Sequence, residues 1–132
     1  MRNLKADLNG QVAVLTGGAG VLGMAMAHAL RQCGAKVALL SRTKSKLEAA
    51  CKELTAASGN ETLALAADAT SEDSLKAALK ELTETWGRPH ILVNAAGGNR
   101  PGATVMPTTD LFATSAADWR AVIDLNLMGT VL

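Results

Sequence analysis

The sequence predicts an α/β fold built on a doubly wound parallel sheet, and three observations support this. Short apolar runs alternate along the chain with segments of helical spacing, which is the pattern of βαβ units. Glycines punctuate the ends of several of these segments. The chain has 132 residues, enough for one domain or part of one, and its 48% hydrophobic content excludes intrinsic disorder.

The first βαβ unit occupies residues 11–41. Residues 11–16 and 36–41 are apolar runs that predict two buried strands. Between them, residues 20–33 are small or apolar on most faces and predict a buried helix, which Gly34 ends as the residue after the C-cap.

The second unit repeats this order. Thr43 is expected to cap a helix that Gly59 ends, and residues 62–67 predict a third strand. The apolar positions of the helix fall at helical spacing and are Leu47, Ala50, Cys51, Leu54 and Ala57.

The third unit begins with a sequence typical of a capping box at residues 70–73. There Thr70 and Asp73 are expected to satisfy the first amides of a helix that Gly87 and Pro89 end. The apolar stripe of this helix is Leu75, Ala78, Leu79, Leu82 and Trp86. Residues 90–94 predict the fourth strand, so the order through this point is β-α-β-α-β-α-β.

A long loop and a further helix complete the pattern. Residues 97–114 are rich in Gly, Pro, Thr, Asn and Asp, and a loop of this length is usually functional or mobile. Residues 115–118 form a second capping-box-like start. The helix that follows carries Trp119, Val122, Ile123 and Met128 on its apolar side.

Composition excludes several functions. A net charge of +1 with no polybasic run indicates neither a nucleic-acid partner nor a membrane surface.

Cys33 and Cys51 are expected to be reduced residues in helices. His28 and His90 have no partners at ligand spacing, so we expect no metal. The start has no apolar signal core, and no stretch has the length of a membrane span, so the expected location is the cytoplasm.

The strongest chemical signal is the glycine-rich stretch Thr16-Gly17-Gly18-Ala19-Gly20-Val21-Leu22-Gly23, which joins the first strand to the first helix. Glycine is needed there because a Cβ would hold a diphosphate away from the backbone amides at the helix start. The stretch lacks the Lys-Ser/Thr ending of a P-loop, which argues against ATP or GTP hydrolysis. The alternative is a tight strand-to-helix turn that binds nothing.

Four motifs in order make the chain resemble the short-chain dehydrogenases/reductases. Thr16-Gly17 with Gly23 resembles the Thr-Gly-x-x-x-Gly-x-Gly motif of that family, except that the middle glycine stands at position 20 and not 21. Asn94-Ala95-Ala96-Gly97 resembles its Asn-Asn/Ala-Ala-Gly motif, and Asp68-Ala69 follows the third strand as in the family. Asn126 matches the helical Asn of its Asn-Ser-Tyr-Lys catalytic set.

The resemblance implies the N-terminal portion of a Rossmann-type fold and an NAD(P)-dependent dehydrogenase or reductase. Asp68 would meet the adenine amino group, and Asn126 would join a water-linked proton relay. The implied cofactor-binding residues are Gly17, Gly20, Leu22, Gly23, Ser41, Arg42, Asp68, Ala69, Asn94, Ala95, Ala96 and Gly97.

The three polar residues of these motifs also have structural interpretations. Asn94 is compatible with a strand-end residue that bonds a turn, and Asp68 with a cap for the turn before Thr70. Asn126 lies on or beside an apolar stripe, which is compatible with a satisfied polar residue in a packed core.

The end of the second strand predicts the cofactor. An NAD enzyme carries an acidic residue there, which holds the ribose hydroxyls. Here the position is Ser41, followed by Arg42, whose guanidinium can pair with a 2′-phosphate, so we predict NADP(H) over NAD(H). In the alternative, Arg42 merely stacks on adenine and either cofactor is accepted.

The loop after the fourth strand bears on the substrate. The run Gly97-Gly98-Asn99-Arg100-Pro101 is similar to a subgroup that acts on sugar acids, the mannonate/fructuronate oxidoreductase type. Arg100 is then a candidate partner for a substrate carboxylate, and the alternative is a solvated loop arginine.

The family's general acid/base is a tyrosine, and the chain has none. We therefore expect the N-terminal half of a longer enzyme, inactive by itself. The resemblance implies that the full-length protein forms a dimer or tetramer, partly through the helix that begins at Ser115. The fourth strand would then be an exposed apolar edge that favours self-association. A bulky residue at Gly17 is expected to abolish dinucleotide binding while sparing the fold. The competing hypothesis is a non-catalytic dinucleotide-binding module or sensor.

Overall fold

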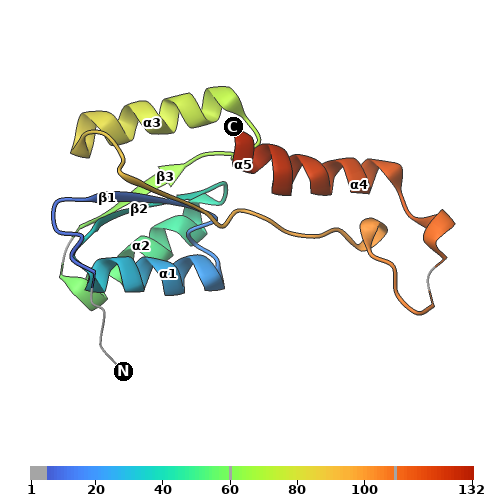
Figure 1. Ribbon diagram of the computed structural model, residues 1–132, viewed down its shortest axis with the longest axis horizontal. Coiled ribbons are helices and arrows are strands. Elements are labelled where there is room, and N and C mark those ends of the chain that lie inside the picture. Colours follow the sequence, from blue (N-terminus) through green and yellow to red (C-terminus); the bar gives the residue numbers. More distant parts are fainter. Residues whose placement is uncertain (1–5, 60, 109) are drawn as a thin grey trace.

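A parallel sheet lies at the centre of the structure (Figure 1). The computed structural model describes residues 6–59, 61–108 and 110–132. Among these, the strands are β1 (Val12–Thr16), β2 (Lys36–Ser41), β3 (Thr62–Ala66) and β4 (Ile91–Asn94), in the order β3-β2-β1-β4. Every neighbouring pair is parallel. The predicted Rossmann-type α/β fold is therefore confirmed.

Helices cover both faces of the sheet. Figure 1 shows α1 (Val21–Gln32) and α2 (Lys44–Ser58) on one face and α3 (Glu72–Trp86) on the other. Because side chains alternate along a strand, β1 and β2 each supply both cores. The core under α1 and α2 contains Ala13, Leu15, Val37, Leu39, Leu47 and Leu54. The core under α3 contains Val12, Val14, Ala38, Leu40, Ala78 and Leu82.

The helix ends largely match the sequence signals. Gly34, Gly59 and Gly87 all have positive φ and stand where the helices end. The start of α3 differs, because its N-cap is Ser71, whose Oγ accepts a hydrogen bond from the Ser74 amide at 3.3 Å. The expected cap by Thr70 and Asp73 is therefore wrong. Thr43 does precede α2, but its side chain makes no capping hydrogen bond within the described structure.

One helical segment projects from the body of the sheet (Figure 1). It consists of α4 (Ala116–Ile123), a π-helical turn η3 (Asp124–Met128) and α5 (Gly129–Val131). Ser115 caps it as predicted, since its Oγ accepts from the Asp118 amide at 3.2 Å. On its expected apolar side, Trp119, Ile123 and Met128 remain 39–50% exposed, so the described structure leaves much of this side uncovered.

The loop before α4 contains two short 3-10 turns, η1 (Pro101–Ala103) and η2 (Leu111–Ala113). At the other side of the sheet, β4 pairs only with β1 in the described structure, and Leu92 is 62% exposed. The predicted open edge is thus confirmed. Beside this edge a groove of about 310 Å³ lies under α3, with Val14, Leu40, Leu65, Leu75, Leu79 and Leu92 in its lining. In the described ranges, no helix has the length and apolar character to cross a bilayer.

Candidate functional site

The carboxyl ends of all four strands meet at one cavity of about 120 Å³. Parallel strands bring their carboxyl ends to the same edge of a sheet, where open α/β folds bind ligands. The predicted residues in the cavity lining are Gly17, Ser41, Arg42, Asp68, Ala69, Ala96 and Gly97. Residues far apart in the sequence are therefore assembled into one site.

Gly17 allows the turn after β1 to touch the end of β4. Its φ is +64°, and a Cβ added there would lie 2.6 Å from the carbonyl oxygen of Ala95 and 2.8 Å from the Ala96 nitrogen. Both atoms belong to backbone, which cannot move aside cheaply. The expectation that a bulky residue at Gly17 would spare the fold is therefore wrong.

Gly23 has a similar role in the first turn of α1. A Cβ there would lie 2.5 Å from the Gly17 oxygen, so only glycine lets the helix rest on the turn. Gly20 is the N-cap of α1, and its amide donates to the Gly17 oxygen at 2.9 Å. Val21, which replaces the usual middle glycine, is 89% exposed, so its side chain fits without disturbing the turn. Leu22 is also exposed, on the surface of α1 and outside the cavity lining.

Thr16 is a positioning residue to which the sequence analysis assigned no role of its own. It is 5% exposed, and its Oγ1 accepts hydrogen bonds from the amides of Ala95 at 3.2 Å and Ala96 at 3.1 Å. These bonds hold the end of β1 against the end of β4, which shapes the cavity. The sequence signal for this role is the threonine of the Thr16-Gly17 pair.

Asp68 lies in the cavity lining and also organises its own turn. Its Oδ1 accepts from the Thr70 amide at 2.9 Å and from the Thr70 hydroxyl at 2.7 Å. These bonds hold the pKa of the Asp68 carboxyl below its usual value, so the group is a carboxylate at neutral pH. The turn-capping interpretation is thus confirmed, but a carboxylate has two oxygens and keeps further acceptor capacity.

The two asparagines lie elsewhere. Asn94 contributes to the groove under α3 and not to the cavity. Asn126 is exposed, so the described structure places no packed core around it, and its side chain binds the loop after β4. Its Oδ1 accepts from the Gly98 amide at 3.1 Å, and its Nδ2 donates to the carbonyls of Gly98 and Val122, each at 2.8 Å. This clamp fixes the loop against η3, and the role of Asn126 in proton transfer stays a prediction.

Arg100 is an exposed loop arginine, as its alternative interpretation expects, and it also has a charged neighbour. Its Nη1 lies 3.7 Å from Asp118 Oδ1, an ion pair that links the loop to α4. The cavity lining also contains three residues that the sequence did not predict for the site, namely Leu40, Ala67 and Leu125.

Comparison with known proteins gives a consistent family. Residues 11–132 match the family model for short chain dehydrogenase. The chain is 46% identical over 100 residues, 76% of its length and 36% of the other protein, to UxuB, an uncharacterized oxidoreductase of Bacillus subtilis.

Solved structures agree with this match. A proposed D-mannonate oxidoreductase from Haemophilus influenza, with bound NAD, superposes with a TM-score of 0.87 at 25% identity, over 96% of this chain and 48% of that one. L-sorbose reductase from Gluconobacter frateurii, complexed with NADPH and L-sorbose, gives a TM-score of 0.82 at 25% identity, over 97% and 46%.

The chain spans about half or less of the length of these relatives. The family model matches residues 11–132, and this range includes the four strands, the glycine turn and the strand-end residues of the cavity. The chain belongs to the short chain dehydrogenase family.

Proposed function

We propose that this chain is the cofactor-binding half of an oxidoreductase that transfers hydride between NADP(H) and a carbonyl or alcohol carbon. The observation that carries the proposal is the single cavity in which Gly17, Ser41, Asp68 and Gly97 meet from four strand ends. The chain matches 36% of UxuB and 46–48% of the two solved structures, which supports the assignment to one part of an enzyme.

The described residues fit a dinucleotide. Gly17 and Gly23 let the turn pack directly against the backbone that follows β4 and against the first turn of α1, which fixes the shape of the loop between β1 and α1. The start of α1 lies beside this turn, and the dipole of a helix favours a diphosphate at its N-terminus. Asp68 offers an acceptor for the adenine amino group. When bound, the nicotinamide would supply the hydride-transfer chemistry.

NADP(H) is the proposed form of the cofactor. Ser41 and Arg42 line the cavity at the end of β2, the position at which an acidic residue would hold free ribose hydroxyls. A neutral serine does not repel a 2′-phosphate, and the adjacent guanidinium can pair with it through two parallel hydrogen bonds.

Titration of the chain with reduced cofactors tests this proposal. We expect NADPH to bind at least about tenfold more tightly than NADH, because one charge-assisted pair contributes on the order of 1.5–3 kcal/mol. Isothermal titration calorimetry measures both affinities. Equal affinities would contradict the preference, and absence of binding would contradict the cofactor site.

The same preparation tests the assignment to half of an enzyme. The chain has no tyrosine to act as the general acid/base that the resemblance implies, so we expect no turnover with any substrate. Steady oxidation of NADPH by the pure chain would overturn this part of the proposal.

A sugar acid is the proposed substrate class of the whole protein. The Gly-Gly-Asn-x-Pro run of the loop after β4 resembles the mannonate/fructuronate type. Two of the similar structures, the proposed D-mannonate oxidoreductase and L-sorbose reductase, have sugar-related names.

We further propose that the whole protein is a homo-oligomer that pairs through the projecting helix. Trp119, Ile123, Leu127 and Val131 follow one another at helical spacing and are 41–68% exposed. Arg120 and Asp124 flank this stripe one turn apart, so an antiparallel second copy can place unlike charges opposite each other.

Substitution Ile123→Glu should shift the chain toward monomer, because it places a charge in the middle of the apolar stripe. Sedimentation velocity measures the change in mass. Lys80→Glu, on the exposed face of α3, is the matched control and should leave the oligomer intact. A wild-type chain that is monomeric at all concentrations would contradict pairing through this helix.

A further inference from the structure

A second cavity adjoins the first at the same edge of the sheet. Its volume is about 470 Å³, and it shares Arg42, Gly97 and Leu125 with the smaller cavity. Its other polar or charged lining residues in the described structure are Thr70, Asn99, Arg100 and Asp124. Arg42 from the end of β2 and Arg100 from the loop after β4 thus line the same cavity, together with Asp124. Asp118, which pairs with Arg100, and Asp68, in the adjoining cavity, offset the charge of these arginines. Two guanidinium groups at one cavity can nevertheless recognise an oxyanion through paired hydrogen bonds.

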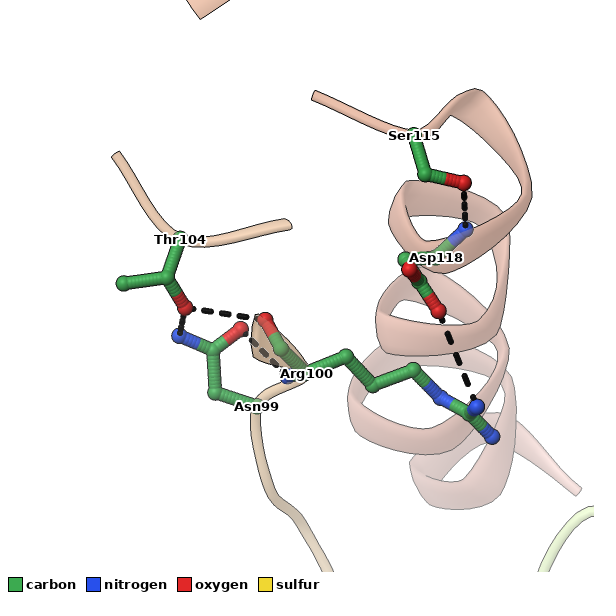
Figure 2. Close-up of polar contacts among 5 residues, drawn as sticks. All are labelled: Asn99, Arg100, Thr104, Ser115 and Asp118. Carbon is green, nitrogen blue, oxygen red and sulfur yellow. Dashed lines mark hydrogen bonds and ion pairs between the residues drawn. The ribbon is translucent and has the colours of Figure 1, made fainter. Parts of the chain in front are cut away.

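The backbone that carries Arg100 is held in place (Figure 2). The Arg100 amide donates to Asn99 Oδ1 at 2.8 Å, and its carbonyl accepts from the Thr104 hydroxyl at 2.8 Å. Asn99 in turn donates to Thr104 Oγ1 at 2.9 Å. The start of the arginine side chain is therefore fixed at the border of the cavity.

The guanidinium itself is held only weakly. Figure 2 shows the Arg100 side chain extended alongside α4 toward Asp118. The ion pair is long, at 3.7 Å, and the two side chains are 57% and 32% exposed. Pairs with this geometry contribute little stability, so exchange of partner by Arg100 costs little.

The backbone of Asp118 is also held in place. Its amide donates to Ser115 Oγ at 3.2 Å in the first turn of α4, and the Ser115 amide donates to the Gly102 carbonyl at 2.8 Å. A Cβ on Gly102 would overlap Asp118 Oδ2, so the loop and the carboxylate are closely packed. The Asp118 carboxylate therefore lies close to the loop that carries Arg100.

We propose that Arg42 and Arg100 together bind an oxyanion of the ligand in this larger cavity, and that Asp118 holds Arg100 until the oxyanion arrives. This inference rests on the proposed function. Phosphate and carboxylate share the chemistry that a planar guanidinium recognises through paired hydrogen bonds. The oxyanion is therefore the 2′-phosphate of NADP(H) or the carboxylate of a sugar acid, and the experiment distinguishes them.

The first arm uses adenosine 2′,5′-bisphosphate and adenosine 5′-phosphate, which differ only in the 2′-phosphate. The second arm uses D-gluconate and sorbitol in the presence of NADPH. Calorimetry compares the wild-type chain with Arg100→Gln and Asp118→Asn. Arg88→Gln, at the opposite end of β4, is the matched control, and circular dichroism checks that each variant is folded.

If Arg100 binds the oxyanion, Arg100→Gln and Asp118→Asn should change the affinity for the anionic probe in opposite directions. Arg100→Gln should weaken binding of the anionic probe about tenfold. Binding of sorbitol or of adenosine 5′-phosphate should be unchanged. Asp118→Asn should tighten the same probe about threefold, because it releases Arg100. A response in the bisphosphate arm identifies the cofactor phosphate, and a response in the gluconate arm alone identifies a substrate carboxylate.

A purely structural pair predicts a different result. If both substitutions weaken binding, or if neither changes either arm, Arg100 is not part of an anion site and the inference is overturned. In that case the proposed function would still stand, provided that the wild-type chain binds the nucleotides. Failure of the wild-type chain to bind any of the nucleotides would contradict the proposed function and this inference together.

Discussion

Replacement of Gly17 by alanine should destabilise the chain far more than the same change at any open glycine. The residue has φ +64°, and a left-handed backbone costs a residue with a Cβ about 1–2 kcal/mol. The new Cβ would also lie 2.6 Å from the Ala95 oxygen, inside van der Waals contact with backbone. We expect the free energy of unfolding to fall by more than about 2 kcal/mol, with loss of NADPH binding.

Gly10→Ala is the matched control for this prediction. Gly10 has φ +77°, but a Cβ there would meet no atom within 4 Å. Gly10→Ala therefore has the free-energy cost of a left-handed backbone without a steric clash. Urea unfolding followed by tryptophan fluorescence gives both free energies. If Gly17→Ala is no more harmful than Gly10→Ala, the close approach of the β1–α1 turn to the end of β4 is not as described.

Substitution Ser41→Asp should reverse the proposed cofactor preference. Ser41 is half-buried and lines the cavity next to Arg42, where a carboxylate would repel a 2′-phosphate and accept hydrogen bonds from free ribose hydroxyls. Like charges placed together cost several kcal/mol, so the affinity for NADPH should fall about 100-fold while that for NADH is kept or improved.

Ser41→Asn separates charge from size, since it has nearly the shape of aspartate without the negative charge. It should lower NADPH affinity much less than Ser41→Asp does. Calorimetric titration of the three proteins with both cofactors measures the effect. An unchanged ratio of affinities in Ser41→Asp would mean that the ribose does not lie at the end of β2.

Local patterns were enough to predict the regular elements. Helix-ending glycines, apolar runs of strand length and the Ser115 cap are short-range signals, and each lies within two residues of its predicted place. The cap of α3 was predicted wrongly, because Thr70 and Ser71 are adjacent hydroxyl residues and either type can cap a helix. Asp68 binds Thr70, which leaves Ser71 at the helix start.

The site was predicted in outline but not in detail. The strand-end positions of Ser41, Asp68 and Gly97 followed from the βαβ pattern, because parallel strands must end at one edge. Thr16 was given no role, since its bonds to Ala95 and Ala96 cross nearly eighty positions of sequence. Asn94 was placed in the site by its motif, yet the alternation of side chains along β4 assigns it to the groove under α3.

The sequence by itself determined the fold class, the glycine turn and the residue types at the strand ends, because these depend on spacing within one or two elements. Only the tertiary structure decided which partners those residues have. Gly17 is constrained by the backbone that follows β4, Asn126 by the amide and carbonyl of Gly98, and Arg100 by Asp118 of α4. Such contacts join distant segments, so their geometry exists only after the sheet and the projecting helix have assembled.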